Sequence, residues 1–153
     1  MAYEEIFQKT ASDYGLDWHL LLEQGYRESR FDPLAVGKAN DLGLMQVLPT
    51  TWDEWAPKVG AFDPFDPESN VRVAAAYLAW IRDQLVKLGR PEAYWMLAAY
   101  NWGIGNVVKL LKGAGNWSQV PQERQDYAND IILAAEANAI GAQMEPAAKK
   151  IHG

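Results

Sequence analysis

The stretch from Asp66 to Leu88 most strongly limits the folds that this 153-residue chain can adopt. Aspartate followed by proline is a typical helix start, because the aspartate side chain caps the first turn and proline fits its first position. Apolar residues then recur every three or four positions, which is the period of a helix with one buried face. They are Val71, Ala74, Ala75, Leu78, Ile81 and Leu85. We predict that this is the longest helix of the chain and that the core is built on helices.

The same helical period is found along most of the chain. Gly15 is expected to end a first helix, Asp17 to cap a second, and the capping box Thr51–Glu54 to open a third. Gly103 and Gly105 are expected to interrupt the helical pattern later in the chain. Besides the helix that starts at Asp66, the expected helices cover residues 3–14, 17–27, 51–59, 91–100, 106–112 and 121–140.

The sequence contains no convincing strand pattern, and we allow at most a short hairpin within residues 31–42. It also contains no repeat, no low-complexity segment and no linker composition. Its length is typical of one domain. We therefore expect a single all-α domain over residues 1–153, with a frayed tail from residue 145 onward.

Composition excludes several classes of function. Cysteine is absent, so the chain has neither a disulfide nor a thiolate centre. The net charge of −6 argues against nucleic-acid binding, which depends on neutralising phosphates. No apolar run is long enough to cross a membrane. The only histidines, His19 and His152, have no further ligand at metal-binding spacing, so we expect no metal and no other cofactor.

Glu28 is the candidate for acid–base chemistry. It stands at the expected end of a helix, within the stretch Arg27–Pro33. A carboxylate there faces the negative end of the helix dipole, and partial burial adds a desolvation cost. Both effects raise the pKa and keep the carboxyl protonated near neutral pH, as a general acid requires.

Two amides are candidates for holding a sugar. Gln46 closes the stretch Gly43–Gln46, and Asn101 lies in the stretch Ala98–Gly103. An amide both donates and accepts hydrogen bonds, as an acetamido group of a sugar requires. Each stretch alone is a weak signal, because a glycine-flanked asparagine is usually a turn or cap residue.

Taken together, these stretches resemble the soluble lytic transglycosylase family, which is related to goose-type lysozyme. The resemblance covers residues 6–133 and implies a lysozyme-like α-helical fold with a cleft. Four motifs in order carry it, and a connecting stretch, Phe65–Val71, also fits. The motifs are Glu28–Pro33, Gly43–Thr51, Ala99–Val107 and Val120–Tyr127.

The resemblance assigns roles by position. Glu28 resembles the family's single catalytic acid. The residues that would position the substrate are Gln46, Asn101 and Tyr127, and those that would line the cleft are Met45, Leu48 and Tyr100. The implied reaction cleaves the bond between N-acetylmuramic acid and N-acetylglucosamine in peptidoglycan and leaves anhydro-muramyl ends.

The resemblance also implies partners and a place of action. Peptidoglycan glycan strands are the expected partner, with chitooligosaccharide as a weak ligand, and we expect a monomer. The site of action would be the periplasm or the cell wall. The start Met1–Ile6 lacks the basic and apolar parts of a signal peptide. We therefore expect a phage-borne enzyme or an excised domain.

The chain departs from the family pattern at several positions. Gly37 stands where the family usually has serine, so the hydroxyl that would lie near the acid is missing. The pair Asn40–Asp41 replaces the usual Gly-Ala pair. Trp102 replaces a small residue and lies either in the core or in the cleft, and Arg124 replaces a usual threonine.

Two other functions stay open at the level of sequence. A lysozyme-like hydrolase needs a second carboxylate to activate water, for which Asp41 is the candidate and Asp32 the next choice. A non-catalytic peptidoglycan-binding or phage structural module is the third reading. The joint presence of the acid, both amides and Tyr127 argues against that module.

Overall fold

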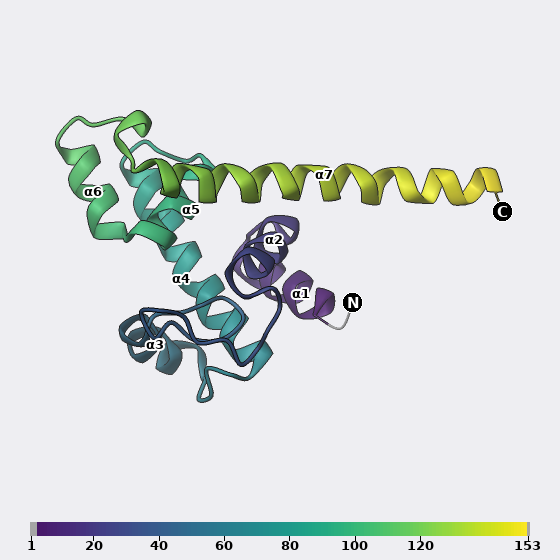
Figure 1. Cartoon of the computed structure of the whole chain (residues 1–153), viewed down its shortest axis with the longest axis horizontal. Helices are drawn as coiled ribbons and strands as arrows, with labels where there is room; N and C mark the ends of the chain where they lie inside the picture. The colour runs from purple at the N-terminus through teal and green to yellow at the C-terminus, as the bar shows by residue number, and fades with distance from the viewer. Residues whose placement is uncertain (1–2, 153) are drawn as a thin grey trace.

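The computed structural model describes the backbone of residues 3–152 and the side chains of residues 3–141. The elements are helices of two kinds, α and 3-10, joined by loops (Figure 1). Among the described residues there is no sheet, so the predicted all-α class is confirmed. In chain order the elements are α1 (Glu4–Tyr14), α2 (Trp18–Ser29), α3 (Pro49–Trp55), η1 (Ala56–Val59), α4 (Pro67–Lys87), α5 (Ala93–Trp102), α6 (Ile104–Lys112), η2 (Trp117–Gln119) and α7 (Gln122–His152).

Three helix ends form as predicted. Gly15 takes the left-handed conformation, with a φ of 66°, and ends α1. The Asp17 carboxylate accepts a hydrogen bond from the His19 N–H at 2.9 Å. The Asp66 carboxylate accepts one from the Ser69 N–H at 3.0 Å. These caps satisfy N–H groups that the first turn of a helix leaves without a partner.

Two predicted helix boundaries were wrong. α3 begins at Pro49, because proline suits the first helical position, and no side chain caps it. The capping box expected at Thr51–Glu54 therefore does not form. Gly105 lies inside α6, and Gly103 alone, with a φ of 109°, separates α5 from α6.

The predicted longest helix was also wrong. α4 has 21 residues, whereas α7 has 31 and runs beyond residue 140 to His152. In Figure 1 the C-terminal half of α7 projects past the other helices. The backbone of the tail from residue 145, which we expected to fray, continues this helix. The side chains of residues 142–153 lie outside the described part, and fraying stays a prediction.

α4 is central to the core. It packs against α1, α3 and α5, while α7 packs against α2 and α5. The inward residues predicted for α4 are all buried. On α2, a Cβ at Gly25 would lie 2.7 Å from the ring of Phe7. Glycine at this position therefore lets α1 and α2 approach closely, which offsets its cost inside a helix.

The loop between α2 and α3 carries several of the predicted site residues. Two isolated antiparallel bridges join Val36 to Leu42 and Leu42 to Val47, and they take the place of the hairpin allowed for in residues 31–42. Gly43 has a φ of 73°, and a Cβ there would overlap with the side chain of Asn70 on α4. The loop and α4 are thus in direct contact at this glycine.

Asn70 holds this loop against the core. Its side chain is fully buried. Its Nδ2 donates to the carbonyl oxygens of Leu42 and Pro64, both at 2.9 Å. Its Oδ1 accepts a hydrogen bond from the Met45 N–H at 2.7 Å. One side chain therefore satisfies three backbone groups of two loops.

We predict that Asn70→Ala lowers the free energy of unfolding by about 2–4 kcal/mol, because three buried backbone groups lose their partner. Urea unfolding followed by circular dichroism measures this loss. Asn129→Ala, at an exposed position of α7, is the matched control and should change stability by less than about 0.5 kcal/mol. A loss below about 1 kcal/mol in Asn70→Ala would contradict the role of this residue.

Candidate active site

Glu28 lies in the last turn of α2 and its side chain is partly buried. Burial is the main cause that raises its pKa from 4.5 to about 7, and the charge of Asp41 acts in the same direction. The hydrogen bond from Tyr127 and the charge of Arg27 oppose this rise. A carboxyl with this pKa exchanges its proton near neutral pH, which suits a group that first donates and then accepts a proton.

Two residues from different helices position this carboxyl. The Tyr127 hydroxyl on α7 donates to Glu28 Oε2 at 2.7 Å, and Gln24 Nε2 on α2 donates to the same hydroxyl at 3.1 Å. Gln24 is fully buried and Tyr127 nearly so. Because the tyrosine proton is directed at Oε2, the proton of the neutral carboxyl belongs on Oε1. Tyr127 therefore orients the acid, and the expected contact with the substrate stays a prediction.

Gln24 is a site residue that sequence reasoning missed. It lies one helical turn before Glu28, so both side chains are on the same face of α2. A glutamine on an otherwise apolar helix face, one turn before a candidate acid, is the signal that points to it. Burial and the charge of Glu28 hold the pKa of Tyr127 well above its usual value, so its hydroxyl stays protonated.

A pocket of about 100 Å³ brings five of the singled-out residues together. They are Gln46, Leu48, Tyr100, Asn101 and Trp102. Burial and then the charge of Glu28 raise the pKa of Tyr100. This electrostatic effect connects the pocket with the acid, although Glu28 is not among the residues that line the pocket.

Gln46 is held tightly by its own loop. Its backbone is left-handed, with a φ of 52°. Its Nε2 donates to the carbonyl oxygens of Ala35 at 3.1 Å and Gly43 at 3.0 Å. The loop thus takes both amide protons, and the oxygen is the part of this amide that would act on a ligand.

The expectation that the Met45 side chain lines the cleft was wrong. This side chain is 0% exposed, and its sulfur lies 3.3 Å from the position of a Cβ at Gly25. The backbone of Met45 contributes instead. Its carbonyl oxygen accepts a hydrogen bond from the Tyr100 hydroxyl at 2.7 Å, which ties the loop to α5.

Asn101 is oriented by Arg124, which stands where the family that the sequence resembles usually has threonine. Arg124 Nη1 on α7 donates to Asn101 Oδ1 at 2.7 Å and to its carbonyl oxygen at 3.3 Å. The amide protons of Asn101 are thus the part of its side chain that would meet a ligand. Trp102 both lines the pocket and packs against the core, so the two positions considered for this ring are combined.

The two candidate second carboxylates differ in their surroundings. Asp32 Oδ1 accepts a hydrogen bond from the Leu34 N–H at 3.0 Å and stabilises a turn. Asp41 Oδ1 accepts one from the Ala39 N–H at 3.2 Å. The charge of Asp41 also acts on both Glu28 and Tyr100. Asp41 is therefore the carboxylate coupled to the site.

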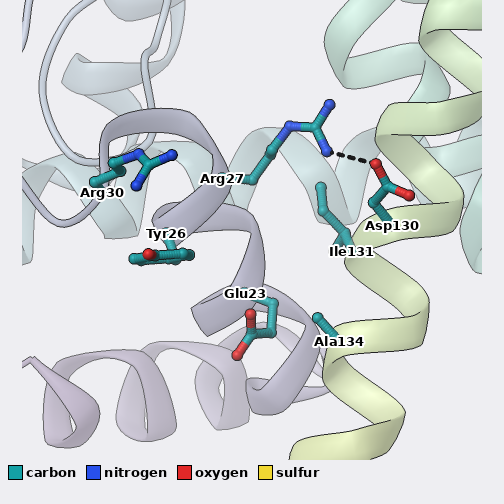
Figure 2. A pocket seen from close by; sticks show the side chains of 7 residues that line it. All are labelled: Glu23, Tyr26, Arg27, Arg30, Asp130, Ile131 and Ala134. Atoms are coloured by element: carbon teal, nitrogen blue, oxygen red, sulfur yellow. Dashed lines mark hydrogen bonds and ion pairs between the residues drawn. The ribbon is translucent and has the colours of Figure 1, made fainter.

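A larger cavity, of about 240 Å³, lies between α2 and α7 and contains none of the predicted site residues (Figure 2). An ion pair between Arg27 and Asp130, at 2.9 Å, joins the two helices there. The guanidinium of Arg30 lies 5.8 Å from the centre of the Tyr26 ring. That of Arg27 lies 5.6 Å from the centre of the Tyr127 ring, so this cavity adjoins the residue that orients the acid.

The described residues offer no metal centre. No three side chains of the metal-binding types come together in that part of the chain. The ring of His19 stacks on Trp18, with the ring centres 3.8 Å apart, and the side chain of His152 lies outside the described residues. Nor does any described helix combine the length and apolar character needed to cross a membrane. The absence of a cofactor stays a prediction.

Known proteins that are similar to this chain identify its family. Residues 5–120 match the family described as the transglycosylase SLT domain. The chain belongs to this family. The lytic murein transglycosylase F of Alcanivorax borkumensis, described as membrane-bound, is 34% identical over 140 residues, which cover 88% of this chain and 28% of that protein. The corresponding protein of Maricaulis maris is 36% identical over 136 residues, covering 88% of this chain and 29% of that protein.

Solved structures of the family share the fold. An inactive Glu-to-Gln mutant of the lytic transglycosylase Slt of Pseudomonas aeruginosa superimposes with a TM-score of 0.76 at 25% identity. The superposition covers 88% of this chain and 23% of the Pseudomonas aeruginosa chain. The 70-kDa soluble lytic transglycosylase of Escherichia coli gives 0.74 at 22% identity, over 87% of this chain and 23% of that one. The SLT-domain chain thus spans less than a third of the length of the relatives named above.

We predict that Tyr127→Phe raises the pKa of Glu28 above about 7, because the lost hydrogen bond stabilised the ionised carboxylate. A ¹³C NMR titration of labelled glutamate side chains measures this pKa without an activity assay. Tyr94→Phe, whose ring packs edge-on against Trp117, is the matched control and should leave the titration unchanged. An equal or lower pKa in Tyr127→Phe would show that the hydroxyl does not stabilise the carboxylate.

Proposed function

We propose that this SLT-domain chain is a lytic transglycosylase that cleaves peptidoglycan glycan strands between N-acetylmuramic acid and N-acetylglucosamine. The observation that carries the proposal is one carboxyl, Glu28, whose pKa is raised to about 7 and which Tyr127 orients. Its charge acts on Tyr100, which lines a pocket that also presents an amide oxygen and amide protons. Membership of the transglycosylase SLT domain family supports the same reaction.

The reaction needs one carboxyl group that acts twice. Neutral Glu28 gives its proton to the glycosidic oxygen, the bond from this oxygen to the anomeric carbon breaks, and the N-acetylglucosamine side leaves as an alcohol. The carboxylate then takes the proton of the C6 hydroxyl of the muramyl residue. The C6 oxygen bonds to the anomeric carbon and closes the anhydro ring. The nucleophile belongs to the same sugar, so its effective concentration is high and no water is consumed.

The pocket would hold the sugar in place during these steps. Gln46 presents its oxygen and Asn101 its amide protons, which together match the donor and acceptor of an acetamido group. The rings of Tyr100 and Trp102 offer apolar faces for a sugar ring. Leu48, with 44% of its side chain exposed, would add apolar contact at the edge. Chitooligosaccharide, which carries the same acetamido groups, would be a weak ligand.

The substrate determines where the chain would act. Glycan strands of murein lie in the periplasm or cell wall, and the relatives that match are described as lytic murein transglycosylases. The chain would bind these strands through local contacts in its pocket, because its net charge of −6 gives no attraction to an acidic polymer. A monomeric state and delivery by a phage or as part of a longer protein stay predictions.

We predict that Glu28→Gln lowers turnover of purified peptidoglycan by at least about 10²–10⁴-fold, because glutamine keeps the shape but delivers no proton. Release of soluble muropeptides measures the rate, and circular dichroism checks the fold. Glu23→Gln, the same exchange on the same helix in the cavity of Figure 2, is the matched control and should keep most of the activity. A folded Glu28→Gln variant with near-normal turnover would remove Glu28 from the mechanism.

We predict that the soluble products carry anhydro-muramyl ends and no matching amount of reducing ends, because the nucleophile is the C6 hydroxyl. Mass spectrometry distinguishes the two, since an anhydro product is lighter than the hydrolytic product by one water. Digestion in heavy-oxygen water is the control and should leave the products unlabelled. Labelled reducing ends as the main product would favour the hydrolase instead.

A further inference from the structure

Gly37 and Asp41 occupy one shared space in the loop that precedes the pocket. The Gly37 N–H donates to the Asp41 carbonyl oxygen at 2.9 Å, which closes a tight turn. A Cβ at Gly37 would overlap with the carboxylate of Asp41. The φ of Gly37 does not lie in the left-handed region, so its backbone conformation is open to alanine. The carboxylate of Asp41, and not the backbone, therefore fills the space that a side chain at position 37 would need.

The position of Asp41 is fixed relative to the pocket. Its neighbour Leu42 donates to the Val47 carbonyl oxygen at 2.9 Å, and the Val47 N–H donates back at 3.0 Å. Val47 and Gln46 both line the pocket. The Ala39 N–H holds one oxygen of the carboxylate, and the side chain stays partly open to solvent. Asp41 is thus anchored by the turn on one side and by the wall of the pocket on the other.

We propose that Asp41 supplies a second carboxyl group to the active site, in the space that a side chain at position 37 would otherwise fill. Asp41 is then a positioning residue, and it acts through Glu28.

Four charged or titratable groups face Glu28. Arg27 on α2 and the Tyr127 hydroxyl on α7 favour the ionised form. Asp41 in the loop disfavours it, and Tyr100 on α5 responds to the charges of both carboxylates. Of these groups, Asp41 is the second carboxyl group, and its charge raises the pKa of Glu28. It therefore helps to keep the proton on Glu28.

The consequence for the reaction rests on the proposed function. Where two carboxyl groups interact, one stays ionised while the other holds its proton more tightly. The charge of Asp41 would keep Glu28 in the acid form that starts the reaction. This effect predicts loss of activity at the alkaline side when Asp41 is neutralised, because Glu28 would then lose its proton at a lower pH.

The first test is Asp41→Asn. The Glu28 pKa, followed by ¹³C NMR in the absence of substrate, should fall below its parent value of about 7. Turnover should drop several-fold at pH 8, with less than about twofold change at pH 5, where Glu28 is protonated in both proteins. Asp63→Asn is the matched control, because Asp63 also caps a loop N–H, that of Phe65 at 2.9 Å. It should change neither quantity.

The second test is Gly37→Ala. The added methyl group should displace the Asp41 carboxylate and lower the Glu28 pKa as Asp41→Asn does. In the double variant Gly37→Ala, Asp41→Asn, alanine should add no further shift, because the group that it displaces is no longer charged. A Gly37→Ala shift of the same size in both backgrounds would overturn the link between the two positions.

Other outcomes separate this inference from the proposed function. An unchanged Glu28 titration in folded Asp41→Asn overturns the inference, whatever the activity. If the parent releases products with reducing ends and Asp41→Asn does not, Asp41 activates water. That result would overturn a role of Asp41 that is exerted through Glu28. If the parent cleaves no peptidoglycan but the NMR shift is present, the proposed function fails while the coupling of the two carboxylates stands.

Discussion

Two hydrogen bonds of the Asn70 side chain join the loop before α3 to the start of α4, and a third binds the connector at Pro64. Leu44, Met45 and Val47 of this loop are buried, and the backbone around them would otherwise leave polar groups without partners away from water. Because Asn70 satisfies them, Gly43 approaches α4 closely enough to exclude any side chain, and Met45 turns into the core. The wall of the pocket that Gln46 forms, and the turn that holds Asp41, both follow from this attachment.

The acid depends on a balance of opposing effects. Burial alone would raise the pKa of Glu28 so far that the carboxyl rarely gave up its proton. With the pKa of a glutamate in water, the carboxyl would be ionised near neutral pH and would have no proton to donate. Tyr127 and Arg27 favour the carboxylate while burial and Asp41 favour the neutral form, and the resulting pKa is about 7. A group that must first donate and then accept a proton works best at such a value. The pKa of Glu28 thus results from opposing contributions, of which burial is the largest.

Local chemistry made part of the structure predictable. The caps at Asp17 and Asp66 and the end of α1 at Gly15 involve residues near in sequence, and they form as expected. The class of the fold and the family followed from helical period and motif order. The orientation of Met45 and the roles of Gln24 and Asn70 were not predictable in this way. Each depends on a contact between residues far apart in the chain, such as that between Gln24 and Tyr127, which no local period reveals.

One face of α7 reaches both parts of the site. Tyr127 contacts Glu28 on α2, and Arg124, three residues earlier, contacts Asn101 on α5. Residues three apart lie side by side on a helix, so the two contacts share one register of α7 against the other helices. A rotation or slip of α7 would release the acid and the pocket amide together. The packing of α7 on α2 and α5 therefore sets the distance between Glu28 and Asn101, and the fold determines the geometry of the candidate site through this helix.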